Sequence, residues 1–370
     1  MTTNKTILII SGEASGDLHG AGLMKEMLLI NKSIKFIGLG GSRMEELGLQ
    51  SLAPLKQLAV MGFWEVAKKI LFFINLKKKI LHTVYNDRPD KVVLIDYPGF
   101  NLNIAKTIKK NFNIPVFYYI SPQLWAWKEK RIKVIQKYVD KMIVVFPFEK
   151  KWYKKRGFEV QYFGHPIVDI KKNYHYKTLN YKKTINIAVC PGSRLQEVER
   201  HMPILRKLIK KYNNQNKLSV NFIIIKAQGV DKKELSKYLK GLEASIVDKP
   251  ILEVFQYCHF GIVASGTASL ESAITTRPFV VIYKMSWISW YMTQKFIKIS
   301  FACIVNILAN KIIVPELLQN NLTVQKLADY IEGCYDQSFQ IEYKNKINGV
   351  INGLGDGNVY KKTAQYILNQ

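Results

Sequence analysis

The sequence predicts an α/β fold made of two Rossmann-like, doubly wound domains. Three features predict it: the length of the chain, two successive series of short apolar runs, and amphipathic stretches between the runs. With 370 residues the chain suits two domains, since one domain usually takes about 100 to 200 residues. Hydrophobic residues (48%) and charged residues (22%) are near the globular average, so the whole chain is expected to fold.

The first series holds five short apolar runs rich in β-branched and aromatic residues. Such runs are typical of parallel strands that are buried on both faces, because neither face is polar. Amphipathic segments at residues 18–29 and 102–111 predict connecting helices. The predicted strands of this first domain, residues 1–170, lie at residues 6–10, 34–39, 91–96, 116–120 and 141–146.

The second series follows a polar stretch rich in Tyr and Lys at residues 171–183. This stretch predicts a linker over residues 170–184 and a second domain over residues 185–345. Two doubly wound domains in tandem leave a cleft between the carboxyl ends of their strands, where ligands of such folds bind. We therefore expect the functional site in that interdomain cleft. The predicted strands of the second domain lie at residues 185–190, 220–226, 260–264 and 279–283.

The chain is strongly basic: 55 Lys and Arg residues against 28 Asp and Glu residues give a net charge of +27. Such an excess favours a partner rich in phosphate or an anionic membrane surface. The basic residues are spread along the chain without a helix-turn-helix, zinc-finger or RNA-binding sheet motif, so nucleic acid is not the expected partner. A second interpretation stays open, in which a Lys- and Asn-rich composition reflects genomic bias.

The four cysteines are scattered, without a CxxC pair or nearby histidine spacing. Neither a zinc site nor a disulfide framework is expected, which fits a reducing cytoplasm. The apolar run at residues 7–10 is too short for a signal peptide, and no segment reaches the about 18 apolar residues of a membrane span. We expect a cytoplasmic protein that does not cross a membrane.

A turn after the first strand of the second domain predicts a diphosphate site. Gly192, Ser193 and Arg194 precede a helical stretch, so freed backbone amides, a hydroxyl and a guanidinium converge where a helix N-terminus already favours anions. The alternative is an ordinary strand-to-helix turn with a surface arginine.

A second glycine turn follows the strand at residues 260–264. The small residues Ser265, Gly266 and Thr267 let a phosphate approach the backbone, and Glu271, on the helix that follows, suits the two ribose hydroxyls. The alternative is a helix cap with a solvent-facing glutamate.

The segment SGEASGDLHG at residues 11–20 opens the first domain after its first strand. It lacks the G-x-G-x-x-G pattern, and its two carboxylates would repel the phosphates of a dinucleotide, which excludes a dehydrogenase. Ser11, Asp17 and His19 do not predict a hydrolase triad, because no G-x-S-x-G elbow is present. Glycine, acid and histidine suit recognition of a polar sugar. Helix capping by Ser15 or Asp17 remains an alternative.

Asp96 ends the strand at residues 91–96 and should project from the carboxyl edge of the sheet into the same cleft. A carboxylate at that edge suits a general base. The alternative is an aspartate that caps a helix or pins its own loop.

Nine motifs occur in one order over nearly the whole chain. They are SGEASGDLHGAG (11–22), LAVMGFWEV (58–66), IDYPGFNLN (95–103), SPQLWAWKEKR (121–131), FPFE (146–149), GHP (164–166), PGSR (191–194), SGTASLE (265–271) and VPELLQ (314–319). Single motifs are weak signals, but the ordered set resembles the lipid-A-disaccharide synthase family.

This resemblance implies a GT-B fold and an inverting glycosyl transfer. The donor would be UDP-2,3-diacylglucosamine and the acceptor 2,3-diacylglucosamine 1-phosphate, and the products the β-1,6-linked lipid A disaccharide 1-phosphate and UDP. Such a transfer needs a base for the acceptor hydroxyl and hydrogen-bonding groups for the departing diphosphate. We expect Asp96 to be the base, with Glu13 and His19 as the next candidates. The expected UDP-binding residues are Gly192, Ser193, Arg194, Ser265, Gly266, Thr267, Glu271, Asn306 and Glu316.

No D-x-D pair is present, so we expect neither a metal nor another cofactor, with Arg194 and helix dipoles neutralising charge. Relatives often carry an aspartate where this chain has Gly99, which leaves Asp96 as the sole carboxylate of its loop. The resemblance also implies a homodimer and a C-terminal helix, residues 346–370, that packs back on the first domain.

Both implied substrates are acylated and phosphorylated, so they reside in a membrane, where basic surface favours contact with anionic lipid. Residues 61–81 mix aromatic and Lys side chains, and the alternative is an amphipathic helix whose apolar face is core. We expect peripheral association with the inner membrane. The candidate docking residues are Phe63, Trp64, Lys68, Lys69, Phe72 and Phe73.

Two other function classes stay open. A UDP-N-acetylglucosamine epimerase or a peptidoglycan glycosyltransferase would share the turns of the second domain, but would not account for SGEASGDLHG or SPQLWAW. A nonenzymatic basic protein would bind nucleic acid in a salt-sensitive way.

Overall fold

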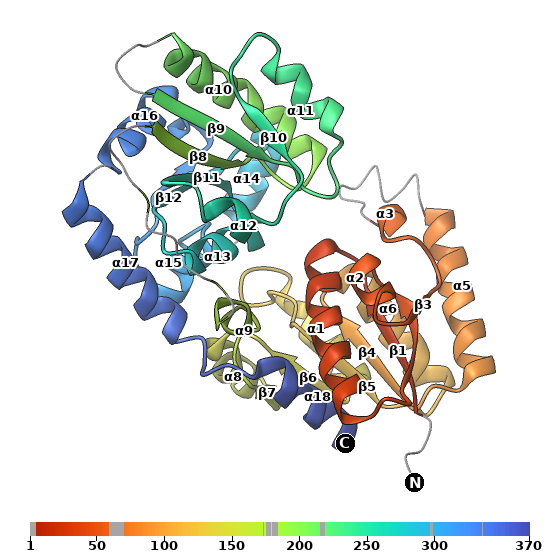
Figure 1. The fold of residues 1–370 in the computed structure, drawn as a ribbon. Helices are drawn as coiled ribbons and strands as arrows, with labels where there is room; N and C mark the ends of the chain where they lie inside the picture. The colour runs from red at the N-terminus through yellow and green to blue at the C-terminus, as the bar shows by residue number, and fades with distance from the viewer. Residues whose placement is uncertain are drawn as a thin grey trace. The chain divides into compact units, whose positions relative to one another are not determined.

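The computed structural model describes residues 5–58, 70–172, 174, 179, 184–214, 219–296, 299–334 and 336–370. The chain forms two compact units, and each is described by itself (Figure 1). Unit 1 comprises Met1–Asp169 with Leu354–Gln370, and unit 2 comprises Ile170–Gly353. Within the described ranges, no helix has both the length and the apolar character needed to cross a membrane.

Unit 1 is built on a seven-stranded parallel sheet with the order β3-β2-β1-β4-β5-β6-β7. Its central strands consist mainly of buried apolar residues, which is why they lie in the middle of the sheet. The chain order reverses between β1 and β4, and a crevice opens at such a switch point, at the carboxyl ends of the strands. The strands are β1 (Thr6–Ser11), β2 (Lys35–Leu39), β3 (Leu49–Ser51), β4 (Lys91–Ile95), β5 (Val116–Tyr119), β6 (Lys141–Val144) and β7 (Val160–Tyr162).

The helices of unit 1 connect these strands, and the last one comes from the C-terminus of the chain. They are α1 (Ala14–Ile30), α2 (Ser42–Glu45), α3 (Leu55–Leu58), α5 (Ile70–Asp87), α6 (Pro98–Asn111), the 3-10 turn η1 (Glu129–Arg131), α7 (Ile132–Tyr138), α8 (Pro147–Lys154), α9 (Ile167–Lys172) and α18 (Val359–Asn369). Helix α9 crosses into the first residues of unit 2.

The C-terminal helix α18 packs on α1 of unit 1. The ring of Tyr360 lies so close to Gly22 that a Cβ there would come within 2.6 Å of it. The ammonium of Lys91, on β4, donates to the carbonyl of Ile367 at 2.7 Å. The boundary expected at residue 345 lies inside α17 (Gln337–Asn352), and the chain returns to unit 1 only at Leu354.

Unit 2 has a six-stranded parallel sheet with the order β10-β9-β8-β11-β12-β13. Its switch point lies between β8 and β11, the two strands that lead into the predicted phosphate turns. The strands are β8 (Thr184–Cys190), β9 (Ser219–Ile225), β10 (Ser245–Val247), β11 (Phe260–Ala264), β12 (Phe279–Tyr283) and β13 (Glu316–Leu318). The remaining helices are α10 (Leu195–Asn213), α11 (Lys232–Leu239), α12 (Ile251–Phe255), α13 (Thr267–Ile274), α14 (Trp287–Phe296), α15 (Ile304–Ala309), η2 (Gln319–Asn321), α16 (Val324–Gly333) and α17.

The two parallel sheets confirm the predicted α/β class, and all nine predicted strands are present. Four further strands, β3, β7, β10 and β13, are only three residues long, which is too short for an apolar pattern to stand out.

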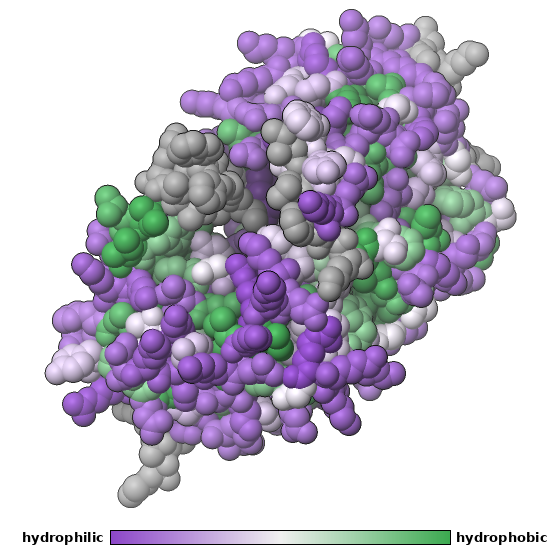
Figure 2. All heavy atoms as spheres, turned by 180° about the vertical axis from the view of Figure 1, so that it is seen from behind, coloured by the Kyte–Doolittle hydropathy of each residue, from purple (hydrophilic) through white to green (hydrophobic). Residues whose placement is uncertain are grey.

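The face shown in Figure 2 is mainly hydrophilic, as a net charge of +27 leads one to expect. Hydrophobic side chains gather at its left edge, over the first turns of α5. There Ile70, Leu71 and Ile74 are 55%, 72% and 45% exposed.

Candidate active site

The corner between β4 and α6 holds Asp96 in an unusual backbone conformation. Asp96 and Tyr97 both have positive φ, at 45° and 50°, which costs about 1–3 kcal/mol for each residue without glycine's freedom. Two hydrogen bonds to the Asp96 carbonyl hold the corner, one from the Tyr118 hydroxyl at 2.6 Å and one from the buried Asn101 amide at 2.8 Å. The fold therefore holds the Asp96 carboxylate on a strained backbone at the switch point of the first sheet.

The carboxyl group of Asp96 is half-buried. Burial, and then the charge of Glu13, raise its pKa to about 7 from an ordinary value of 3.8. The same two causes raise the pKa of Tyr97 to about 12, so the Glu13 carboxylate lies near both residues. A carboxylate with a pKa close to the operating pH is well matched to general-base catalysis.

The loop after β1 approaches this corner because it contains glycine. Ser11, at the end of β1, is paired with Ile95 of β4, so the two loops start side by side. A Cβ on Gly12 would lie 2.3 Å from the Tyr97 ring, and only glycine allows that approach. The Tyr97 hydroxyl in turn donates to the carbonyl of Leu58 at 2.9 Å.

Asp17 is buried and accepts three backbone hydrogen bonds at the start of α2. The donors are the amides of Gly41, Met44 and Arg43, at 2.8, 3.2 and 3.4 Å. This agrees with the capping alternative, except that Asp17 caps α2 and not its own helix. It is committed to the fold of unit 1.

His19 is buried beside the C-terminal helix, and its Nδ1 lies 2.9 Å from the Tyr360 hydroxyl. Burial, and then the charge of Arg43, lower the pKa of His19 to about 4. The imidazole is therefore neutral at pH 7 and a weak proton acceptor. Asp96, with a pKa of about 7, is therefore better matched to proton transfer near neutral pH than His19.

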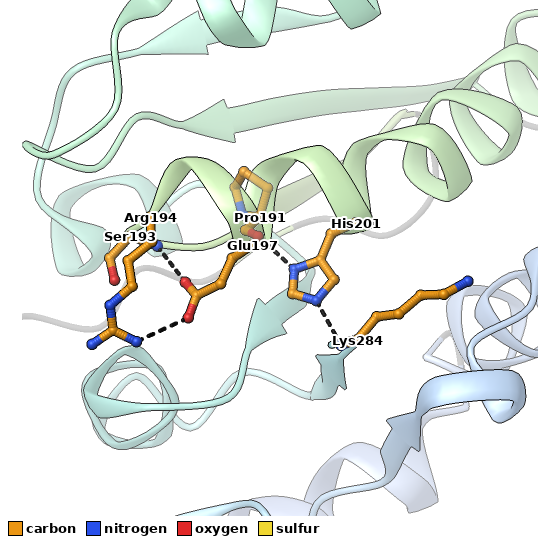
Figure 3. Close-up of polar contacts among 6 residues, drawn as sticks. All are labelled: Pro191, Ser193, Arg194, Glu197, His201 and Lys284. Carbon is orange, nitrogen blue, oxygen red and sulfur yellow. Dashed lines mark hydrogen bonds and ion pairs between the residues drawn. The ribbon is translucent and has the colours of Figure 1, made fainter. Parts of the chain in front are cut away.

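The turn after β8 is organised by two side chains of α10, Glu197 and His201 (Figure 3). The Glu197 carboxylate accepts from the Ser193 amide at 2.9 Å and from the Arg194 guanidinium at 3.2 Å. Gly192 has φ 136°, and a Cβ there would lie 2.5 Å from the Cβ of Glu197. Glu197 thus fixes the turn while leaving most of the Arg194 donors available.

His201 is fully buried and connects this turn to the end of β12. Its Nδ1 lies 2.6 Å from the Pro191 carbonyl, and its Nε2 accepts from the Lys284 amide at 2.9 Å (Figure 3). The carbonyl requires a proton on Nδ1 and the amide requires a lone pair on Nε2, so the ring is neutral. Burial, the largest cause, lowers the pKa of His201 and favours the same state.

The turn after β11 is open at the start of α13. Gly266, the N-cap, has φ 141°, and both Gly266 and Thr267 are exposed. The Ser265 hydroxyl donates to the Ala302 carbonyl at 2.7 Å. Glu271 is half-buried, and its charge adds to burial in raising the pKa of the Cys190 thiol, which places Glu271 near the end of β8. The two predicted turns therefore lie together in unit 2.

The side chains of Asn306 and Glu316 are hydrogen-bonded to each other and to nearby backbone groups. The Asn306 amide donates to Glu316 and to the Val314 carbonyl, both at 2.7 Å, and its oxygen accepts from two backbone amides. Glu316 accepts from the amides of Ala302 and Cys303 at 2.9 and 3.0 Å. Both side chains hold the loop to which Ser265 is bonded.

The candidate docking residues divide between described and undescribed parts of the chain. Phe63, Trp64, Lys68 and Lys69 lie outside the described residues. Phe72 and Phe73 are half-buried against the core of unit 1, and the Phe73 ring contacts that of Phe100 at 5.7 Å. Their aliphatic neighbours on α5, Leu71 and Ile70, are exposed.

Sequence reasoning assigned no role to Asn101, Tyr118, Glu197, His201 or Tyr360. Glu197 and His201 are four residues apart on one helix just after PGSR, a spacing that marks one helix face. Asn101 lies within the motif IDYPGFNLN. Among the residues with described placement, no group of three or more His, Cys, Asp or Glu side chains forms a metal site.

The chain has the GT-B fold. Solved structures with the same fold include the glycotransferase of kitacinnamycin, which has a TM-score of 0.62 and 13% identity and covers 100% of this chain and 99% of its own. The UDP-GlcNAc 2-epimerase from Neisseria meningitidis, bound to UDP-GlcNAc, also has a TM-score of 0.62 and 13% identity, with 99% and 100% covered. At such identity the likeness shows the fold alone, and it confirms the predicted GT-B architecture.

The chain belongs to the lipid-A-disaccharide synthase family, as its motifs predicted. The model of the lipid-A-disaccharide synthetase family matches residues 7–362. Lipid-A-disaccharide synthase 1 of Legionella pneumophila is 36% identical over 356 residues, which cover 94% of this chain and 92% of the relative. Lipid-A-disaccharide synthase of Geobacter sulfurreducens is 32% identical over 380 residues, covering 99% and 97%. The chain is therefore a glycosyltransferase of lipid A disaccharide synthesis, and neither the epimerase nor the nucleic-acid alternative is favoured.

Proposed function

We propose that this chain transfers 2,3-diacylglucosamine from UDP to the 6-hydroxyl of 2,3-diacylglucosamine 1-phosphate. The observation that carries the chemistry is the half-buried Asp96 carboxyl, with a pKa of about 7, at the switch point of the first sheet. Asp96 takes the proton of the 6-hydroxyl, and the hydroxyl oxygen bonds to the anomeric carbon. The bond from that carbon to the diphosphate breaks on the opposite face, and its electron pair leaves with UDP.

Unit 2 supplies the groups that hold UDP. Arg194, with the amides at the start of the 19-residue helix α10, bears the charge of the departing diphosphate. The exposed turn at Ser265, Gly266 and Thr267 adds backbone contacts, and Glu271 accepts from the ribose. Asn306 and Glu316 act on this site by positioning the Ser265 loop. On this proposal neither a metal nor another cofactor takes part, because Arg194 and the helix N-terminus carry the charge.

The membrane surface is part of the same proposal, because both substrates carry acyl chains. Exposed Ile70, Leu71 and Ile74 on α5 suit insertion at the headgroup boundary, with Lys78 exposed on the same helix to contact anionic lipid. We place the enzyme at the cytoplasmic face of the inner membrane, and flotation with anionic against neutral vesicles tests this. Family resemblance alone supports a homodimer, which sedimentation velocity tests.

The direct test is UDP release by purified protein mixed with both dispersed lipid substrates. Arg194→Ala should weaken UDP binding about 10- to 100-fold, because it removes charge-assisted hydrogen bonds to the diphosphate. Lys207→Ala removes an exposed charge from the same helix and should change UDP binding less than about twofold. The absence of UDP release from folded wild-type protein would refute the proposed reaction. Unchanged UDP affinity in Arg194→Ala would refute the role of that arginine.

A further inference from the structure

The segment between β5 and α7, residues 120–131, carries three basic residues, Lys128, Lys130 and Arg131. Glu129, the one acid in the segment, is engaged by Arg156, whose Nη2 and Nε lie 2.6 and 2.9 Å from its carboxylate. Among the described residues, neither Lys128 nor Arg131 has a carboxylate partner. Arg131 is nevertheless half-buried. A half-buried guanidinium without an anion is expected where a ligand supplies one.

The Lys128 side chain and the segment that carries both cations are held in place. The Lys128 ammonium lies 4.2 Å from the centre of the Trp127 ring, which is itself 49% exposed. Lys128 has φ 55°, and Ile120, at the start of the segment, has φ 64°, which is a rare conformation for a β-branched residue. Two hydrogen bonds fix the segment between Ile120 and Lys128. The hydroxyl of Ser121 contacts that of Tyr153 at 2.7 Å, and the Trp125 indole donates to the buried Glu149 at 3.1 Å. Strain of this kind collects at ligand sites.

The two cations lie close to each other and to the Asp96 corner. Burial, and then the charge of Arg131, lower the pKa of Lys128, so the two side chains repel each other. Burial raises the pKa of Tyr118 well above its usual value, and Arg131 opposes that rise, which places the guanidinium near the Tyr118 hydroxyl. That hydroxyl is the group that donates to the Asp96 carbonyl at 2.6 Å.

We propose that Lys128 and Arg131 bind the 1-phosphate of the acceptor sugar. The proposal rests on the proposed function and names the residues of unit 1 that recognise the phosphate of the acceptor. Carbon 1, which carries the phosphate, and carbon 5, which carries the 6-hydroxymethyl group, flank the same ring oxygen. A sugar whose 6-hydroxyl is at Asp96 therefore holds its phosphate within one ring's width of that residue. A phosphate monoester bears close to two negative charges, which two adjacent cations match. The planar Arg131 fork suits bidentate contact, and Lys128 acts as a point charge.

The experiment compares two acceptors that differ only in the 1-phosphate, the natural lipid and its dephosphorylated form. Wild-type enzyme should prefer the phosphorylated acceptor. Arg131→Gln should raise the KM for that acceptor about 10- to 100-fold and remove the preference, while the KM for the UDP-sugar stays unchanged. Lys128→Gln should act in the same direction, and Arg131→Lys should restore part of the preference. Lys133→Gln, which removes an exposed charge on α7, should behave like wild type.

The proposal is overturned if Arg131→Gln keeps the preference for phosphate, or if it lowers turnover equally with both acceptors, as a purely structural residue would. Direct binding keeps the test separate from catalysis. Wild-type protein should bind diacylglucosamine 1-phosphate more tightly than its dephosphorylated form, and Arg131→Gln should bind both alike. If wild-type protein releases no UDP, the proposed reaction fails, and the binding comparison still decides whether this phosphate site exists.

Discussion

Asp96→Asn separates the chemical role of this residue from its effect on stability. The amide has the shape of the carboxyl group and can accept the Tyr97 amide hydrogen bond that the carboxylate accepts. It cannot take a proton from the acceptor hydroxyl. We expect turnover to fall by about 100- to 10,000-fold, the usual contribution of a general base, with unchanged UDP affinity.

The same substitution should stabilise the folded protein at alkaline pH. The folded-state pKa of Asp96 is about 7 and its ordinary value is 3.8, so ionised Asp96 disfavours folding. Three pKa units correspond to about 4 kcal/mol at most, and solvent contact of this half-buried group reduces that to about 2 kcal/mol. Because the raised pKa keeps the folded wild type protonated at acidic pH, the gain from Asn is full above pH 7 and disappears below about pH 4.

The measurement is chemical unfolding of both proteins at pH 8 and pH 5, beside UDP-release assays. We expect more than half of the stability gain at pH 8 to be absent at pH 5. A variant that turns over within tenfold of wild type would refute the base assignment. An equal stability difference at both pH values would refute the raised pKa and the burial argument behind it.

Two further predictions concern glycine and histidine positions of the site. Gly12→Ala should reduce turnover at least tenfold, because the added methyl group would lie 2.3 Å from the Tyr97 ring and displace it. The control is Gly99→Ala, whose methyl group meets no atom within 4 Å and which should resemble wild type in the same assay. Equal activity of the two variants would contradict this packing argument. His201→Leu should lower the free energy of unfolding by about 2–4 kcal/mol, because it leaves the Pro191 carbonyl and the Lys284 amide unpaired. His201→Gln should recover part of this loss, since the glutamine amide can both donate and accept a hydrogen bond. Urea unfolding measures the free energy of unfolding of both His201 variants. An equal loss of stability in the two would show that the hydrogen bonds of His201 do not stabilise the fold.

The strands of the fold were predictable because each sheet is parallel and buried on both faces. Runs such as residues 7–10 and 92–95 are apolar at every position, and few alternatives to a buried strand exist for them. The short edge strands β3 and β10 lack such a run and take their conformation from pairing with β2 and β9. Their existence depends on partners distant in the chain, which local pattern does not contain.

The sequence predicted which candidate site residues lie at the ends of strands. It did not predict which other residues they contact. Sequence placed Arg194 in a turn after a strand, and it left open whether Asp17 bound a sugar or capped a helix. Three backbone amides of residues 41–44 settle Asp17 as a cap, and they come from a different helix. Tyr360 reaches His19 from 341 positions away along the chain. Such partners follow from the tertiary fold alone.

The two phosphate turns of unit 2 and the Asp96 corner of unit 1 reach positive φ by different means, and the difference follows their proposed chemistry. In unit 2 the turns use Gly192 and Gly266, which adopt φ 136° and 141° at little cost and let a ligand approach the backbone. In unit 1 the positions with positive φ include Asp96, Tyr97 and Lys128, whose side chains glycine could not supply. Strain is tolerated there because a carboxylate and a cation must project from the segments that follow β4 and β5. Hydrogen bonds such as those to the Asp96 carbonyl offset it. A binding turn needs an open backbone, and a reacting corner needs fixed side chains.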